Sequence, residues 1–200
     1  MKIENTLYDD ANCSMKTESS EIPNKFLEWL PRKGRLLNVG CGPFTEAERM
    51  LQMGLDVYGC DISRFAIKKI CDHKIRLCDA RVRIPFKNNY FDIVYCTEVI
   101  EHLGQVGRFF DEITRVTKRD GMLLLSTPLF NYWKFRLKIM LGKDIFDDYH
   151  CRYFTKESIK SKLEKCGFEI VDYEVAGRFK HIKKSLCGHI FLKAIRCDRK

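Results

Sequence analysis

The sequence lacks the features that mark several common protein classes. Its ten cysteines include no C-x-x-C pair, so neither a zinc ribbon nor a dithiol redox site finds support. No run of about 18 apolar residues is present, as a membrane-spanning helix would need. Residues 1–15 carry no apolar core of a signal peptide. We therefore expect buried, reduced thiols in a soluble, cytoplasmic protein.

The chain also lacks the third glycine of the dinucleotide-binding fingerprint G-x-G-x-x-G. Gly40 and Gly42 supply the first two glycines, but Thr45 stands where the third belongs. This gap disfavours NAD, because the third glycine allows close packing of helix on strand. The two glycines still join an apolar run at 36–39 to a predicted helix at 45–53. We expect the N–H groups of this turn to point outward, toward a bound group.

A second apolar run, at 57–60, ends in Asp61. In a doubly wound fold the carboxyl ends of neighbouring parallel strands open onto the same crevice. An acidic side chain at the end of the second strand then lies within reach of a ribose. The turn and Asp61 together predict a cofactor of the nucleoside type.

The string LLNVGCGPF at 36–44 resembles the first motif of class I S-adenosylmethionine-dependent methyltransferases, and the resemblance extends to about residue 168. It departs from the family at Asn38, where an acidic residue is usual, and at Phe44, where a third glycine is usual. The resemblance implies S-adenosyl-L-methionine as the cofactor. In the family, the acid at the position of Asp79 accepts from the exocyclic amine of adenine. The cofactor-binding residues that the resemblance implies are Asn38, Gly40, Cys41, Gly42, Asp61, Ile62, Asp79, Ala80, Cys96 and Thr97.

The pattern of apolar runs and turn residues predicts an α/β fold. We expect a Rossmann-like, doubly wound, mostly parallel sheet of seven strands that ends in an antiparallel hairpin. The strands are predicted at 36–39, 57–60, 75–78, 91–96, 122–125, 168–175 and 190–195. One domain would span 1–200, with an arm and helix at 1–31 and an inserted lid or substrate region at 129–153. Ser63 and Thr155 are predicted helix caps, and the helix carrying Phe109 is expected to stop at Asp120.

The string TEVIEHL follows the fourth strand. If Thr97 caps a helix there, Glu98, Glu101 and His102 lie on one side of it. With His150 they could hold a divalent cation. A similar E-x-x-E-H occurs in ubiquinone-pathway O-methyltransferases and small-RNA 2′-O-methyltransferases that use a metal, but also in metal-free relatives. We assign no metal ligand.

The resemblance implies transfer of a methyl group to an oxygen or nitrogen of a small-molecule acceptor. The aromatic residues of the insertion favour an apolar or aromatic acceptor. A hydroxyl acceptor needs a base, and His150 is the first candidate and His102 the second. A neutral amine needs none. The net charge of +9 keeps a metal-assisted RNA methyltransferase open as an alternative, and the basic amphipathic insertion keeps peripheral membrane contact open. Asn38 and Phe44 keep a catalytically silent cofactor-binding module open as well.

Overall fold

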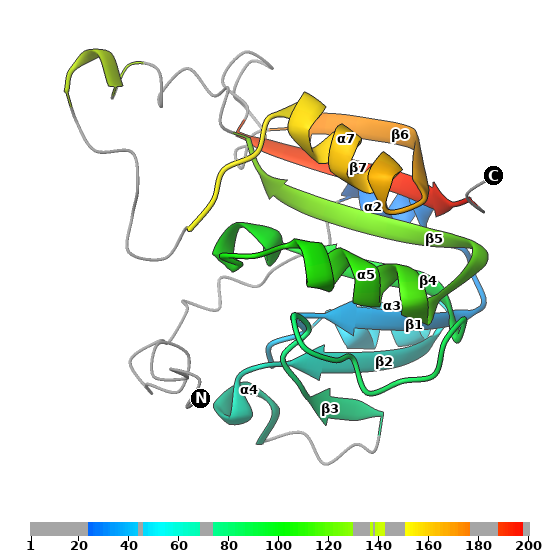
Figure 1. Cartoon of the computed structure of the whole chain (residues 1–200). Helices are drawn as coiled ribbons and strands as arrows, with labels where there is room; N and C mark the ends of the chain where they lie inside the picture. The colour runs from blue at the N-terminus through cyan, green and yellow to red at the C-terminus, as the bar shows by residue number, and fades with distance from the viewer. Residues whose placement is uncertain are drawn as a thin grey trace.

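The computed structural model describes residues 24–43, 46–68, 74–129, 137, 139–142, 151–176 and 188–197. Their strands form one seven-stranded sheet in the order β3-β2-β1-β4-β5-β7-β6 (Figure 1). Strands β1 to β5 pair in parallel, whereas β7 runs antiparallel to both β5 and β6. The α/β doubly wound fold with an antiparallel C-terminal hairpin is therefore confirmed. The strands are β1 (Arg35–Val39), β2 (Asp56–Asp61), β3 (Ile75–Leu77), β4 (Phe91–Thr97), β5 (Thr117–Pro128), β6 (Phe168–Ala176) and β7 (His189–Arg196).

Helices cover both faces of the sheet (Figure 1). Helices α5 (Gly107–Val116) and α7 (Lys156–Lys165) pack on one face, and α2 (Asn24–Trp29) and α3 (Ala47–Gln52) pack on the other. The predicted N-terminal helix is α2. It lies on the sheet face, where the fully buried Phe26 ring meets the rings of Tyr95 and Phe191. It therefore builds core and does not cover an edge of the sheet.

Two predicted helix caps are confirmed and one predicted helix end is wrong. The Ser63 hydroxyl accepts from the Ala66 N–H at the start of α4 (Arg64–Lys68), and Thr155 forms a capping box with Ser158 at α7. Helix α5 ends at Val116, before the predicted Asp120. Thr117 instead pairs with Phe91 of β4 and donates its hydroxyl to the Ile113 carbonyl. A contact with a distant strand therefore ends the helix.

Most of the insertion at 129–153 lies outside the described residues, as do His150, Phe130 and Trp133. An isolated parallel bridge between Leu129 and Phe154 joins its two ends. Leu129 is buried, whereas the apolar side chains at 137 and 139–141 are exposed. Among the described helices, none is long and apolar enough to cross a membrane.

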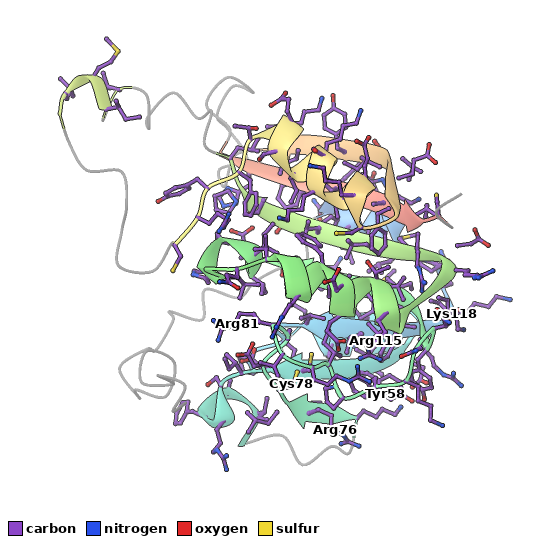
Figure 2. The ribbon with its side chains drawn as sticks, in the orientation of Figure 1. Tyr58, Arg76, Cys78, Arg81, Arg115 and Lys118 are labelled. Carbon is purple, nitrogen blue, oxygen red and sulfur yellow. The ribbon has the colours of Figure 1, made fainter. Side chains whose placement is uncertain are left out.

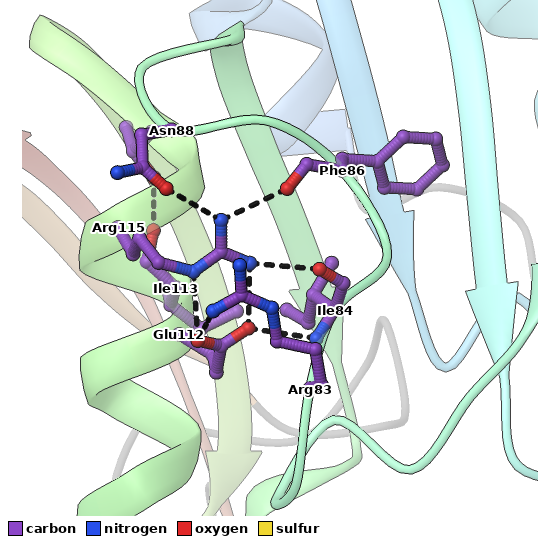
Figure 3. Close-up of polar contacts among 8 residues, drawn as sticks. Arg83, Ile84, Phe86, Asn88, Glu112, Ile113 and Arg115 are labelled. Atoms are coloured by element: carbon purple, nitrogen blue, oxygen red, sulfur yellow. Dashed lines mark hydrogen bonds and ion pairs between the residues drawn. The ribbon is translucent and has the colours of Figure 1, made fainter.

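The loop at 79–90 is fixed to α5 by one arginine. Figure 2 labels Arg115 beside α5, and Figure 3 shows its contacts with the loop. Its guanidinium donates to the carbonyls of Ile84 and Phe86 at 2.7 and 2.8 Å. It also pairs with the Glu112 carboxylate at 2.6 Å, and that carboxylate accepts from the Ile84 N–H at 2.7 Å. The pair thus satisfies polar groups of a loop that has no strand partner of its own.

We expect Arg115→Met to lower the free energy of unfolding by about 3 kcal/mol, because it leaves two loop carbonyls without their arginine donor and removes the closest cation from the Glu112 carboxylate. That carboxylate then keeps only the Ile84 N–H and the longer contact with Arg83 among the described residues. Lys118→Met is the matched control, since Lys118 pairs with Asp92 at 2.6 Å but both side chains are more than a third exposed. It should cost at most about 1 kcal/mol. Urea denaturation of the three proteins measures the difference. Equal losses in the two variants would contradict this role of Arg115.

Candidate functional site

Four neighbouring parallel strands end at one edge of the sheet. Reading across the order β3, β2, β1 and β4, this edge carries Asp79, Asp61, the turn at 40–42 and Thr97. Ligands of open α/β sheets bind in the crevice outside such carboxyl ends. The structure therefore brings most of the residues predicted from the sequence to one side of the molecule.

The glycine turn is held by β2. The N–H groups of Gly40 and Cys41 donate to the Cys60 carbonyl at 2.8 and 3.2 Å, and the Gly42 N–H donates to Asp61 Oδ2 at 2.7 Å. The expectation that these N–H groups point outward is wrong, because the end of the neighbouring strand uses all three. What the turn offers a ligand is space. Among the described residues, a Cβ atom at Gly42 would meet nothing within 4 Å, whereas one at Gly40 would lie 2.4 Å from Val99 Cγ2.

Asp61 joins three segments of the chain at this edge. Its Oδ2 atom accepts from Gly42, and its Oδ1 atom accepts from the Ser63 N–H at 2.7 Å. Its carbonyl accepts from the Cys78 N–H at 2.8 Å, which aligns the end of β3. A carboxylate offers about four acceptor positions, so each oxygen keeps capacity for a further donor. The half-buried side chain can thus hold the turn and still accept from two hydroxyls.

Asp79 lies just beyond β3 and binds its neighbour Arg81. The carboxylate accepts from the Arg81 backbone N–H and from the guanidinium, with the shortest contact 2.7 Å from Nη2 to Oδ2. Burial opposes ionisation of Asp79, but the hydrogen bonds from Arg81 outweigh it and the pKa lies below its ordinary value. Asp79 therefore acts as a turn aspartate here, because its carboxylate accepts from a backbone N–H two residues further on.

The end of β4 does not start an α-helix. Thr97 is the last strand residue, Glu98 has a φ of +52°, and only a short 3-10 turn follows at Ile100–His102. The predicted helix with a Thr97 cap is therefore wrong. The Ser126 hydroxyl of β5 donates to Glu98 Oε1 at 2.7 Å, and His189 Nε2 of β7 lies 3.1 Å from Glu98 Oε2. These partners from distant strands hold Glu98 in its unusual conformation.

Glu101 is the most deeply buried charged group at this edge, with no exposed surface. Its Oε2 atom accepts from the Thr127 hydroxyl at 3.2 Å, and its Oε1 atom has no hydrogen-bond partner in the part of the chain that the structure describes. His102 Nε2 lies 4.0 Å from that oxygen. Burial and the neighbouring Glu98 carboxylate raise the pKa of Glu101 to about 8. The predicted Glu98, Glu101 and His102 thus do lie together, although not on a helix.

His189 and Thr127 were not predicted as site residues. The sequence signal for them was weak: Ser-Thr-Pro ends the fifth strand, and a histidine begins the last one. Among the described residues, no three histidine, cysteine or acidic side chains are arranged to hold one metal ion, and His150 lies outside them.

The remaining predicted cofactor residues occupy the same edge with different exposure. Asn38, Cys41 and Cys96 are buried, whereas Ile62 and Ala80 are half-buried. Asn38 lies inside β1, in register with Gly59 of β2 and Tyr95 of β4. Asn38 is therefore a buried polar residue of the sheet interior.

Comparison with known proteins gives a consistent answer. The family model described as "Methyltransferase domain" matches residues 14–173. A ubiquinone biosynthesis O-methyltransferase of Nitrobacter winogradskyi is 31% identical over 118 residues, which cover 54% of this chain and 44% of that protein. A probable S-adenosylmethionine-dependent methyltransferase of Mycobacterium tuberculosis is 27% identical, with 72% and 51% covered. The chain thus spans about half the length of these curated relatives.

Solved structures share the fold. A structure of SAM-dependent methyltransferases from Methanosarcina mazei matches with a TM-score of 0.73 and 16% identity, covering 90% of this chain and all of that one. The [4+2]-cyclase SpnF matches with a TM-score of 0.67 and 19% identity, covering 86% and 78%. At such identities the likeness concerns the fold, and the second example shows that one fold serves different reactions.

The raised pKa of Glu101 predicts how stability depends on pH. The folded state favours the neutral carboxyl of Glu101. The contribution of this carboxyl to the stability of the fold is therefore complete below the ordinary pKa of 4.5 and is lost as the pH rises through about 8. Glu101→Gln keeps an acceptor for Thr127 without the charge. We expect the variant to gain stability relative to the wild type between pH 5 and pH 9, as measured by urea denaturation. The exposed Glu48→Gln is the control, and a difference independent of pH would contradict the assignment.

Proposed function

Because the chain belongs to the class I S-adenosylmethionine-dependent methyltransferases, we propose that it transfers a methyl group to an oxygen or nitrogen of a small-molecule acceptor. The observation that carries the proposal is the edge where open space at Gly42 adjoins a carboxylate, Asp61, with acceptor capacity to spare. We do not assign the full activity of the longer relatives to this chain, because it spans about half of their length.

The residues at this edge fit S-adenosylmethionine. The open face of the turn at 40–42 leaves room for the chain that bears the sulfonium, and Asp61 can accept from both ribose hydroxyls. Ile62 and Ala80 would border the adenine, and Cys96 and Thr97 would border the methyl group. When bound, the sulfonium supplies an activated methyl group, so the protein must mainly hold the acceptor in line with it.

The residues placed to remove a proton from the acceptor lie where β4 and β5 end and β7 begins. His102 is one-quarter exposed, and the Glu101 carboxylate lies 4.0 Å behind its Nε2 atom. Because the pKa of Glu101 is about 8, its carboxyl is mostly neutral at pH 7 and does not hold a proton on the imidazole as an ionised carboxylate would. His102 is thus suited to take the proton of a hydroxyl acceptor. The named O-methyltransferases among the relatives support oxygen as the target. His150, the first candidate base from the sequence, lies outside the described residues and stays a candidate.

A binding protein without methyl transfer is the second candidate function. Asn38 replaces the usual acid of the first motif, and the Asp79 carboxylate is already bound to Arg81. The similarity to a protein named as a [4+2]-cyclase adds a different reaction on the same fold. This candidate predicts cofactor binding without turnover on any acceptor.

Calorimetry with S-adenosylmethionine and S-adenosylhomocysteine tests the cofactor site. We expect Asp61→Asn to weaken the binding of both ligands by about 1.5 to 3 kcal/mol. The NH2 group of the asparagine cannot accept a hydrogen bond from the turn or from a ribose hydroxyl. Asp56→Asn is the control at the opposite end of β2, where Asp56 pairs with Lys74. Failure of the wild-type chain to bind either ligand would remove the proposed function. Unchanged affinity in Asp61→Asn would show that the ribose lies elsewhere.

Transfer of a labelled methyl group to a catechol and to a primary amine separates the acceptor classes. With a catechol, His102→Gln should lower kcat about a hundredfold or more, because a hydroxyl must lose its proton. With a neutral amine the same variant should keep most of its rate. An equal loss on both acceptors would contradict a role as base, and binding of the cofactor without transfer to either would favour the second candidate function.

A further inference from the structure

The Asp79–Arg81 pair occupies the position where adenine recognition is expected. Asp79 Oδ1 accepts from the Arg81 backbone N–H and from Nε, each at 2.9 Å. Asp79 Oδ2 accepts from Nε at 3.1 Å and from Nη2 at 2.7 Å. All of the roughly four acceptor positions of the carboxylate are therefore in use. An adenine amine can bind here only if one of these donors leaves.

The two oxygens differ in what holds them. The backbone N–H of Arg81 reaches Oδ1 alone, and the N–H groups of Val82 and Arg83 donate to the Asp79 carbonyl. The turn therefore keeps its backbone hydrogen bonds if the guanidinium moves away. Among the contacts of the described residues, the Oδ2 atom is held by the guanidinium alone. It is the oxygen that can change partner without unfolding the turn.

The guanidinium can leave at low cost. The Arg81 side chain is 36% exposed and lies at the edge where β1 and β2 end, whereas the Asp79 side chain is only 14% exposed (Figure 2). An arginine at the surface stays hydrated after it releases its partner, while a mostly buried carboxylate needs a new donor. When an incoming N–H group replaces the Arg81 guanidinium, the Asp79 carboxylate therefore loses one hydrogen-bond donor and gains another.

We propose that Arg81 is a specificity-determining residue of the cofactor site. Its guanidinium binds Asp79 Oδ2 until the 6-amino group of adenine takes the place of the guanidinium. This inference rests on the proposed function, since it assumes an adenosyl ligand at this edge. Arg81 then lowers the affinity for every adenosyl ligand. It also reduces the preference for a 6-amino over a 6-oxo purine, because a 6-oxo group offers Asp79 no donor at that atom.

Calorimetry on the full chain with S-adenosylhomocysteine and its 6-oxo analogue, S-inosylhomocysteine, tests the exchange. Arg81→Leu should bind S-adenosylhomocysteine about fivefold more tightly, the size expected for loss of one partly exposed ion pair. Its affinity for S-inosylhomocysteine should not rise. Arg81→Gln, which keeps the backbone contact and removes the charge, should act in the same direction and serves if the leucine variant does not fold.

Arg83→Leu is the matched control. Arg83 is a neighbouring arginine of the same turn that pairs with Glu112 and has no contact with the Asp79 carboxylate among those described. It should bind both ligands as the wild type does. Equal or weaker binding of S-adenosylhomocysteine by both Arg81 variants would overturn the inference, and weaker binding would mean that Arg81 itself contacts the purine. Absence of binding by the wild type would instead overturn the proposed function, so the two failures are distinct.

Discussion

The arrangement of this edge depends on the Asp61 carboxylate. With its two oxygens it binds the turn after β1 and the start of α4, and its carbonyl binds the segment after β3. One residue therefore fixes three loops that belong to different βα units. This explains why the turn at 40–42 can be open toward solvent and still be ordered. Its N–H groups are satisfied from the side of the sheet, which leaves the opposite side for a ligand.

The sequence was sufficient for the parts of the fold that depend on local patterns. The parallel strands β1 and β4 are largely buried, so they appear as mainly apolar runs, interrupted by Asn38 and Asp92, and they were predicted within one residue. The caps at Ser63 and Thr155 were predictable because a cap contacts an N–H group only a few residues away. The carboxyl-end positions of Asp61 and Asp79 followed from the same strand boundaries.

The errors share one cause, which is a partner far away in the sequence. Helix α5 ends early because Thr117 pairs with β4, and the segment after Thr97 leaves the helical path because Ser126 and His189 bind Glu98. The turn N–H groups were expected to face a ligand because the Cys60 carbonyl and the Asp61 carboxylate could not be located from spacing alone. Helix periodicity carries no information about such contacts.

The antiparallel hairpin has a consequence for the chemistry of the edge. In a purely parallel sheet the strand next to β5 would bring only its carboxyl end here, but β7 runs the opposite way and brings its first residue, His189, to Glu98. The proposed site thus has two independently built halves. Turns after β1, β2 and β3 build the adenosyl half, while β5 and β7 supply the hydroxyls and imidazole that surround Glu98 and Glu101. Because the halves share only β4, changes in the hairpin can alter the acceptor side without disturbing the contacts of Asp61.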